Sequence, residues 1–423
     1  MGRRQALASQ PQAATSEAMS EQRRNCLDTD SEAARSRYLS TGPRYHWEAD
    51  VGAIRVLFGE GRLGELGTIV EDLAAKRALV VSDLGVHQAG HVRRALEALS
   101  TSSIAVHLYD GVTENPTTDL VEAAARQVAD FEPDCIVGLG GGSCMDCAKA
   151  INFLLTNGGS ITDYWGYGQT HASMLPSIGI PTTAGTGSEA QSFALISDAD
   201  SGRKMACGDP QALFRRVVLD PGLIASAPPR VAAAAGIDAV SHAIESHVST
   251  RRNPISRVWS KRAWELLQSS LQSAQSKEAD PGDLGKTLLG AHLAGAAIEQ
   301  SMLGAAHACA NPLTATYGIT HGQAIGVLLP HVVRFNSTVV ADDYSTFCDL
   351  AGLDRTDEPG ETLAAYIEQL LQTLELPGRL QDLGVSRGDL EALADAAALE
   401  WTARFNPRPV SQAELFEIYE SAY

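Results

Sequence analysis

Strand and helix patterns alternate between about Trp47 and Asp220, and this alternation restricts the chain to few folds. Five short apolar runs have the pattern of buried strands: 78–82 (ALVVS), 104–108 (IAVHL), 135–139 (CIVGL) and, more weakly, 177–180 (SIGI) and 217–219 (VVL). Helical stretches lie between them, for example at 120–131 and 145–155. Because parallel strands need long crossover connections, the alternation predicts an α/β domain with a parallel sheet covered by helices.

The pattern changes after Pro228-Pro229. Long segments rich in alanine and leucine follow, at 231–248, 259–275, 284–304 and 362–374. Their periodicity predicts an all-α domain. We place the boundary near residue 225, which gives an α/β domain over 43–225 and a helical domain over 226–423. Residues 1–42 are polar and lack a sustained hydrophobic period, which predicts a disordered tail.

Composition and charge indicate the class of protein. Apolar residues make up 44% of the 423 residues, which suits a globular core. No run reaches the roughly 18 uninterrupted apolar residues of a membrane-spanning helix, and the N-terminus lacks an apolar signal segment. The 33 basic and 51 acidic residues give a net charge of −18, which argues against nucleic acid as a partner. We expect a cytoplasmic protein with neither a membrane nor a nucleic-acid partner.

The cysteines do not indicate a disulfide framework. There are seven of them, an odd number, and they are scattered along a large chain. Cys144 and Cys147 form a CxxC pair, which is compatible with a redox pair or half of a zinc site. Because no second CxxC completes a four-cysteine site, we expect both to be buried small residues.

A glycine-rich turn follows the strand at 135–139 and precedes the helix at 145–155. It contains Gly138, Gly140, Gly141, Gly142 and Ser143. Glycines let the backbone turn tightly and approach a ligand. We expect Ser143 to cap the helix, with Asp146 completing a capping box, and the free N–H groups to favour a phosphate. A simple tight turn is the alternative, because the pattern is not GxGxxG.

Two further features accompany this turn. The segment 181–189 (PTTAGTGSE) concentrates hydroxyl and amide donors, although a polar surface loop has the same composition. Asp83 ends the strand at 78–82, where a carboxylate can bind the ribose hydroxyls of NAD and repel the extra phosphate of NADP. A turn-forming Asp before Gly85 is an equally common alternative.

The helical stretch at 231–248 carries a candidate metal-binding pair. Asp238 and His242 are four residues apart, which puts them on one face of the helix. Glu245 lies near the same face and is a candidate to hydrogen-bond to one of the metal ligands and orient it.

Two histidines further along the chain extend this pair. His307 and His321 flank a segment that Pro312 and Gly318 are expected to break. One aspartate and three histidines make a mixed nitrogen and oxygen site, which suits Fe(II) or Zn(II) without discriminating well between them. A chance arrangement is the alternative, because the chain has 11 histidines.

Several stretches taken together resemble the iron-containing (group III) alcohol dehydrogenase family. They are VVSD at 80–83, ENP at 114–116, GLGGGSCMDCAKA at 138–150, PTTAGTGSE at 181–189, GIDAVSHAIE at 236–245 and GAAHACANPLTATYGITHGQAIGVLLPHVVRFN at 304–336. The resemblance runs from about residue 45 to the C-terminus and keeps the family's order and spacing. It implies a Rossmann-like N-terminal domain, a helical C-terminal domain and an active site in the cleft between them.

The resemblance also implies cofactors and the residues that bind them. The metal, Fe2+ with Zn2+ as the alternative, falls on Asp238, His242, His307 and His321. The contacts to NAD fall on Asp83, Asn115, Gly141, Gly142, Ser143, Thr182, Thr183, Thr186 and Lys204. The two glycines and Ser143 are expected to hold the pyrophosphate.

The implied reaction interconverts a small alcohol and its aldehyde or ketone by metal-assisted hydride transfer to or from NAD(H). We expect a homo-oligomer, a dimer or larger. The alternatives are a zinc polyol dehydrogenase of the glycerol type and a non-catalytic protein that binds a nucleotide or a metal. Metal-free relatives such as the maleylacetate reductases fit less well, because the Asp–His–His–His set is intact. Lyases of the dehydroquinate synthase type use a different ligand pattern.

Two positions depart from the family's pattern. Many members carry a second histidine near the nicotinamide, four residues after the one that matches His307, where this chain has Asn311. Some members carry a small polar residue where this chain has Phe193, which we expect to narrow or dry the pocket. We expect Asn311 to orient the substrate, because its amide does not titrate near neutral pH as histidine does. Alternatively, Asn311 only ends a helix before Pro312. His307 and Asn311 are the catalytic candidates.

Overall fold

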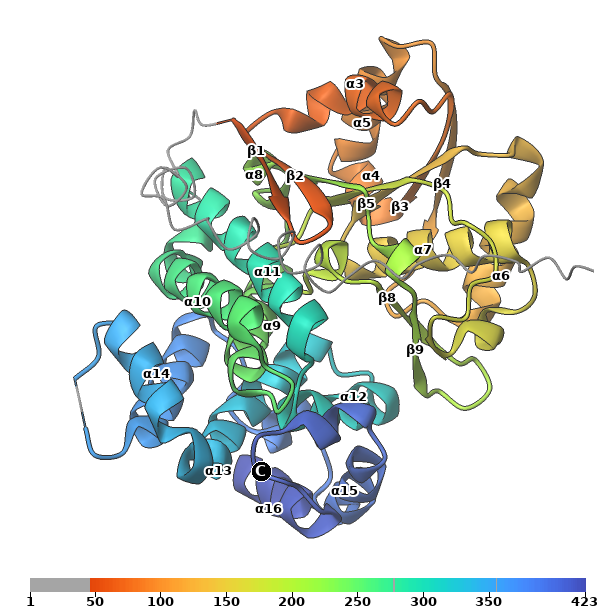
Figure 1. Ribbon diagram of the computed structural model, residues 1–423. Coiled ribbons are helices and arrows are strands. Elements are labelled where there is room, and N and C mark those ends of the chain that lie inside the picture. The colour runs from red at the N-terminus through yellow and green to blue at the C-terminus, as the bar shows by residue number, and fades with distance from the viewer. Residues whose placement is uncertain (1–45, 277, 355) are drawn as a thin grey trace, which may run out of the picture. The chain divides into compact units, whose positions relative to one another are not determined.

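The computed structural model describes residues 46–276, 278–354 and 356–423. The predicted tail at 1–42 lies outside these described residues. The described part of the chain belongs to one compact unit, so the domain boundary near residue 225 stays a prediction. Figure 1 shows a region of strands and helices beside a region of long helices.

A seven-stranded sheet forms the centre of the first region. Its strands are β1 (Trp47–Val51), β2 (Ile54–Phe58), β3 (Arg77–Asp83), β4 (Ala105–Val112), β5 (Cys135–Gly140), β7 (Ser177–Pro181) and β10 (Arg216–Leu219). Their order is β1-β2-β10-β7-β5-β3-β4, and all neighbours are parallel except the antiparallel pair of β1 and β2. The predicted parallel α/β fold is confirmed, and all five predicted strands are present. β1 and β2 were not predicted.

Helices cover both faces of the sheet because side chains alternate along each strand. On β3, Ala78 and Val80 belong to one apolar cluster, whereas Leu79 and Val81 belong to another. The first face is covered by η1 (Arg62–Glu65), α3 (Leu66–Asp72), α4 (Leu84–Gln88) and α5 (His91–Ser100). The second is covered by α6 (Thr118–Val128), which continues into η2 (Ala129–Phe131), and by α7 (Gly142–Asn157).

The central strands end side by side at one edge of the sheet. Gly140 at the end of β5 pairs with Pro181 at the end of β7, and Gly138 pairs with Val81 of β3. We call this the carboxyl edge. In open parallel sheets, ligands bind at this edge because the loops and helix N-termini gather there.

A second, three-stranded sheet was not predicted from the sequence. It contains β6 (Gly166–Tyr167), β9 (Lys204–Gly208) and β8 (Phe193–Ser197), in that order. The short helices η3 (Ile161–Tyr164), η4 (Ser188–Ala190) and η5 (Pro210–Ala212) lie near it in the chain. These strands have two to five residues, and none was among the strands predicted from the sequence.

The rest of the described chain after β10 contains helices and no strand, as predicted. The helices are α8 (Pro221–Ile224), α9 (Pro229–Val248), α10 (Pro254–Ala274), α11 (Pro281–Ser301), α12 (Ala305–Tyr317), α13 (His321–Leu350), α14 (Pro359–Thr373), η6 (Leu380–Leu383), η7 (Arg387–Asp389), α15 (Leu390–Ala398), η8 (Trp401–Phe405) and α16 (Gln412–Ala422). The four predicted helical segments correspond to α9, α10, α11 and α14.

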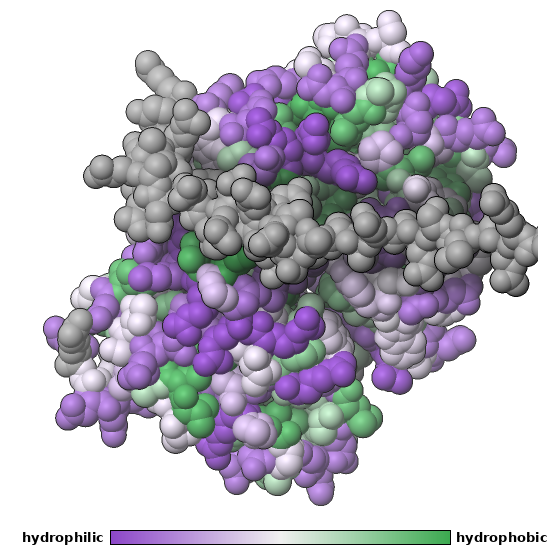
Figure 2. Space-filling model, in the orientation of Figure 1, coloured by the Kyte–Doolittle hydropathy of each residue, from purple (hydrophilic) through white to green (hydrophobic). Residues whose placement is uncertain are grey.

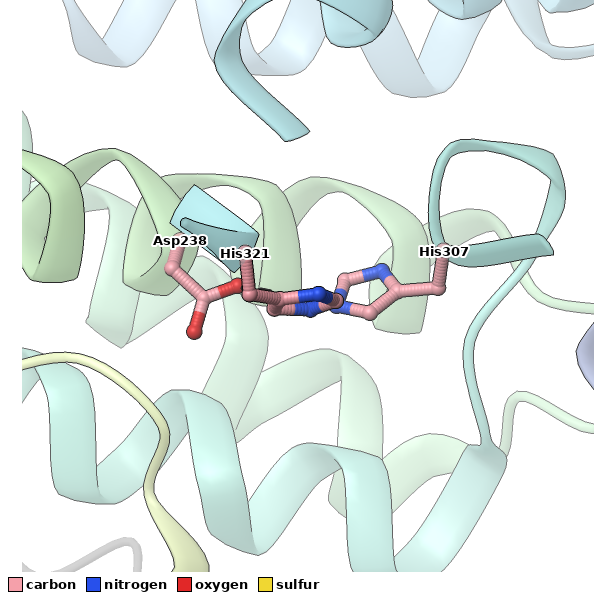
Figure 3. Close-up of side chains that lie close together, drawn as sticks. All are labelled: Asp238, His307 and His321. Atoms are coloured by element: carbon pink, nitrogen blue, oxygen red, sulfur yellow. Dashed lines mark ion pairs between the residues drawn. The ribbon is translucent and has the colours of Figure 1, made fainter. Parts of the chain in front are cut away.

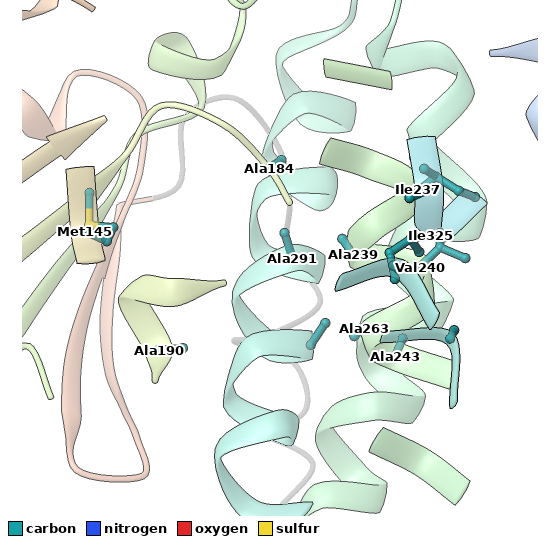
Figure 4. Packing of buried hydrophobic residues seen from close by; sticks show 14 of the residues in the cluster. Met145, Ala184, Ala190, Ile237, Ala239, Val240, Ala243, Ala263, Ala291 and Ile325 are labelled. Carbon is teal, nitrogen blue, oxygen red and sulfur yellow. The ribbon is translucent and has the colours of Figure 1, made fainter. Parts of the chain in front are cut away.

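Helix α9 lies at the centre of the helical region and packs against α10, α11 and α13. Figure 4 shows Ala239 and Val240 of α9 among Ala263 of α10, Ala291 of α11 and Ile325 of α13. A helix that is apolar on all sides is a buried helix. Polar side chains on α9 are therefore held away from water, and the two metal-ligand candidates on it are among them.

The expected break at Pro312 is wrong. Helix α12 continues through Pro312 and ends at Gly318, whose φ of 65° is left-handed. Pro312 and its neighbour Leu313 are buried, so tertiary packing holds the helix despite the missing N–H. The alternative that Asn311 ends a helix is excluded for the same reason, because Asn311 lies in the middle of α12.

One described helix, α13, is long and apolar enough to cross a membrane, with a mean hydropathy of 1.4. However, 61% of its apolar window is buried inside the protein, so packing against other helices accounts for its composition. On the face shown in Figure 2, hydrophilic residues are interspersed with smaller hydrophobic patches.

Candidate active site

Four side chains from three helices converge in the helical region. Asp238 and His242 lie on α9, His307 lies on α12, and His321 is the first residue of α13. Figure 3 shows Asp238, His307 and His321 pointing toward one another. We call these four residues the ligand cluster. All four were predicted metal ligands, and the structure brings them together.

The distances in the ligand cluster suit a four-coordinate ion. Oδ1 of Asp238 lies 3.3 Å from Nε2 of His242, 3.6 Å from Nε2 of His307 and 3.7 Å from Nε2 of His321. The Nε2 atoms of His242 and His307 are 3.0 Å apart. Around a tetrahedral ion with bonds near 2.1 Å, neighbouring ligand atoms are about 3.4 Å apart.

An unpaired oxygen atom in the cluster also indicates a site for a cation. Oδ1 of Asp238 is buried and has no hydrogen-bond partner. Burying a carboxylate oxygen without a partner is costly unless a cation compensates it. The donor set of one carboxylate and three imidazoles therefore fits a divalent metal. Asp238, His242 and His307 are buried, whereas the side chain of His321 is 24% exposed, so the cluster is open on the side of His321.

Glu245 orients one of the ligands. Its Oε2 lies 2.5 Å from Nδ1 of His307, and its Oε1 accepts the backbone N–H of Ala306 at 2.8 Å. This arrangement places a proton on Nδ1 and leaves Nε2 of His307 free toward Asp238. The possible supporting role of Glu245 therefore corresponds to a direct contact in the structure.

The electrostatics of the ligand cluster are set by burial and by its two carboxylates. Burial alone lowers the pKa of His307, but the nearby carboxylates of Asp238 and Glu245 outweigh it and raise the pKa to about 9. Burial lowers the pKa of His321 to about 3 and also lowers that of His242. Burial raises the pKa of Asp238, yet the three histidines, His242 foremost, reverse the shift and hold it below its usual value. Asp238 is thus a carboxylate, as a metal ligand must be.

The glycine turn lies at the carboxyl edge of the sheet. Helix α7 begins at Gly142 with Gly141 as its N-cap, and no side chain caps it. The prediction that Ser143 caps the helix is therefore wrong. Ser143 lies within the first turn, and its Oγ accepts the backbone N–H of Asn115 at 3.3 Å. The uncapped N–H groups at this helix start are available to an anion.

The segment 181–189, which we call the threonine loop, lies directly against this turn. A Cβ on Gly142 would come within 2.7 Å of Cγ2 of Thr186, and one on Gly141 within 3.4 Å of Oγ1 of Thr183. The N–H of Thr182 donates to the carbonyl oxygen of Gly140 at 2.9 Å. Gly142 is therefore needed for packing as well as for approach to a ligand.

The remaining predicted dinucleotide contacts join the same edge. Lys204, at the start of β9, donates to Oδ1 of Asn115 at 3.3 Å. Asp83 ends β3 and caps α4 by accepting the N–H of Val86 at 2.9 Å. Asp83 therefore stabilises the turn before α4, which was the alternative interpretation. Its carboxylate also lies at the end of β3, where the dinucleotide is expected. All nine predicted residues gather at the carboxyl edge.

Asn311 has a partner that the sequence analysis missed. Its Nδ2 donates to Oε2 of Glu400 at 2.8 Å. Burial raises the pKa of Glu400, and the hydrogen bond from Asn311 opposes that shift. The two residues are 89 positions apart, so no local pattern could have paired them.

Phe193 belongs to a chain of aromatic rings between the small sheet and η8. Its ring centroid lies 5.5 Å from that of Tyr167 and 5.9 Å from that of Trp401. Phe193 is also held through its backbone, because its carbonyl oxygen accepts Nζ of Lys149 at 2.7 Å. Lys149 is buried and donates to Ser188 as well, so it ties helix α7 to the segment that carries Phe193.

The six cysteines in the described part of the chain are free and buried. They include Cys144 and Cys147, which form no disulfide with each other. This agrees with their interpretation as buried small residues. Burial raises the pKa of both thiols, so neither has the lowered pKa of a reactive cysteine.

Comparisons with known proteins match nearly the whole described chain. The family model "Iron-containing alcohol dehydrogenase" matches residues 53–221. The model "Fe-containing alcohol dehydrogenase family, C-terminal" matches residues 232–423. Alcohol dehydrogenase 4 of Schizosaccharomyces pombe is 36% identical over 367 residues, which cover 86% of this chain and 87% of the relative.

Solved structures agree with the sequence matches. A 1,3-propanediol oxidoreductase superposes with a TM-score of 0.85 at 29% identity, covering 90% of this chain and 99% of that one. A sulfoacetaldehyde reductase from Bifidobacterium kashiwanohense, solved in complex with NAD+, has a TM-score of 0.79 at 27% identity and covers 88% of this chain and 97% of that one.

Proposed function

The chain belongs to the iron-containing alcohol dehydrogenase family, and on that premise we propose that it interconverts a small alcohol and its aldehyde or ketone with NAD(H). The observation that carries the proposal is the ligand cluster, in which one carboxylate and three imidazoles converge at ion-binding distances around an unpartnered buried oxygen. Relatives named for small alcohols and aldehydes, and one solved with NAD+, support the substrate class and the cofactor.

The proposed reaction uses two sites, one for the metal and one for the dinucleotide. Asp238, His242, His307 and His321 would hold the metal, which would supply Lewis-acid chemistry toward the substrate oxygen. Glu245 keeps Nδ1 of His307 protonated so that Nε2 faces the ion.

At the carboxyl edge, the N–H groups of the α7 start bind the pyrophosphate. The threonine loop packs against that turn and supplies further donors to the dinucleotide. Phe193 and Trp401 contribute apolar surface that excludes water from a hydride transfer.

We propose Fe2+ as the metal because the family is named for it, with Zn2+ as the alternative. A mixed set of one oxygen and three nitrogen ligands accepts either ion. Metal analysis of the purified protein, followed by removal with a chelator and reconstitution with each ion, distinguishes the two. Restoration of activity by Fe2+ alone supports the proposal, whereas restoration by Zn2+ alone assigns the site to zinc.

The activity itself is tested by following NADH oxidation with a panel of small aldehydes and ketones. Rapid turnover of glycerol-type ketones and little else would favour the zinc polyol dehydrogenase. Tight binding of NADH and metal without turnover of any carbonyl compound would favour the non-catalytic alternative. Assembly as a homo-oligomer and a cytoplasmic location stay predictions, which sedimentation analysis and cell fractionation can test.

A further inference from the structure

The Asp83 carboxylate is held by donors from two different elements. Its Oδ1 accepts the N–H of Val86 at the start of α4, at 2.9 Å. Its Oδ2 lies 3.1 Å from Sγ of Cys144, in the first turn of α7. A carboxylate fixed at both oxygens cannot rotate about its last bond, and each oxygen keeps a second lone pair.

Cys144 is suited to be the donor in this contact. Its side chain is fully buried, and burial, followed by the nearby charge of Asp83, raises the pKa of its thiol well above the usual value. The group is therefore an S–H at neutral pH, which can donate to a carboxylate and does not repel it. The contact to Asp83 gives this thiol a role beyond that of a small buried residue.

Gly140 makes room for the contact. Its φ is +152°, and a Cβ there would come within 2.4 Å of Sγ of Cys144 and 3.3 Å of Oδ2 of Asp83. The end of β5, the start of α7 and the end of β3 thus meet at one point. That point lies beside the uncapped helix start to which we assign the pyrophosphate.

We propose that Cys144 is a positioning residue for cofactor choice, whose thiol holds the Asp83 carboxylate in the orientation that accepts ribose hydroxyls and opposes a 2′-phosphate. The proposal rests on the proposed use of NAD(H). In this arrangement Val86 and Cys144 fix the plane of the carboxylate, and the remaining lone pairs face the ribose. Without the thiol, the carboxylate keeps only the Val86 bond and can turn away.

The test compares dissociation constants for NADH and NADPH, measured on the full-length protein by calorimetry without substrate. Cys144→Ala removes the donor, and Cys144→Ser keeps a donor at the same position. Cys147→Ala is the matched control, because Cys147 is an equally buried thiol on the same helix, while the hydrogen bonds of Asp83 come from Val86 and Cys144. Thermal denaturation of each variant checks that the fold is intact.

We expect the wild type to bind NADH more tightly than NADPH. Cys144→Ala should reduce this preference by roughly three- to tenfold, the range that one lost hydrogen bond spans. Cys144→Ser should restore the preference to within about twofold, and Cys147→Ala should leave it unchanged. A Cys144→Ala variant that weakens both cofactors equally, or changes neither, overturns the proposal.

A double-mutant cycle separates positioning from general packing. In the Asp83→Gly background, which lacks the carboxylate, Cys144→Ala should leave the ratio of the two dissociation constants unchanged. An equal effect of Cys144→Ala in both backgrounds refutes the positioning role. If the wild type binds neither dinucleotide, the proposed function itself fails, and this outcome is distinct from failure of the role of Cys144.

Discussion

The ligand cluster and the carboxyl edge are built from different parts of the chain. The cluster consists of four side chains on three helices, and its chemistry resides in their oxygen and nitrogen atoms. The carboxyl edge consists mainly of backbone groups, with glycines and small hydroxyl residues that let a ligand approach. The first site should therefore be sensitive to loss of a functional group. The second should be sensitive to added bulk.

Removal of a ligand is expected to have the largest effect. Asp238→Ala or His321→Ala should lose most of the bound metal and reduce kcat/KM by at least about 100-fold, because three donors remain where four converged. Elemental analysis and NADH oxidation measure the two quantities, and circular dichroism checks the fold. His171→Ala, at an exposed histidine, is the control. Full metal content in either ligand variant contradicts the assignment.

Protonation of His247, on the same helix α9 as Asp238 and His242, should destabilise the folded protein in acid. Burial lowers the pKa of this histidine to about 4, and the charge of Arg257 adds to the effect while Asp343 opposes it. The unfolded chain binds this proton near pH 6.5 and the folded protein only near pH 4. Stability is therefore lost as the pH falls from 6.5 toward 4, and at pH 5 the loss amounts to about 2 kcal/mol or roughly 30-fold in the unfolding equilibrium.

Urea unfolding of the wild type and of His247→Gln at pH 7.5, 6.0 and 5.0 measures this effect. Because other groups titrate in the same range, the quantity to follow is the difference in unfolding free energy between the two proteins. It should shrink as the pH falls. A constant difference means that His247 is protonated equally in the folded and unfolded states.

Added bulk at the carboxyl edge should have a smaller and more selective effect. Gly142→Ala places a Cβ within 2.7 Å of Thr186 and shifts the start of α7. We expect NADH binding to weaken about tenfold while the metal content stays at the wild-type level. Calorimetry and elemental analysis measure the two. Gly64→Ala is the control, because a Cβ at that position meets nothing within 4 Å. Loss of metal from Gly142→Ala would contradict the prediction that the two sites respond independently to substitution.

Asn311 lies one turn from His307, and its substitution should have the smallest effect. Asn311→Ala leaves Glu400 without its amide donor and should raise KM about threefold with less change in kcat. Asn311→His should add an ionisation to the pH profile of kcat without loss of metal. If both variants match the wild type across the pH range, Asn311 has only a structural role.

Local patterns in the sequence were sufficient for much of the fold. Short continuous apolar runs predicted the five parallel strands, and period-3.6 hydrophobicity predicted four of the long helices. The glycine turn was recognised because a strand, a glycine run and a helix follow one another directly. Residue type and spacing made the four metal-ligand residues candidates, and the resemblance supplied the full list of dinucleotide contacts. The structure gathers each set in one place. The strands β6, β8 and β9 were not predicted.

Contacts between distant residues were decided only by the tertiary structure. Pro312 lies inside a helix because its surroundings are packed, and Ser143 does not cap α7 because the N-cap is Gly141, two residues earlier. Asn311 with Glu400 and Asp83 with Cys144 join residues 89 and 61 positions apart. Hydrophobic periodicity records which face of an element is buried, but not which other element covers it. These pairings depend on how the elements pack, so a single sequence specifies their residue types without showing that they touch.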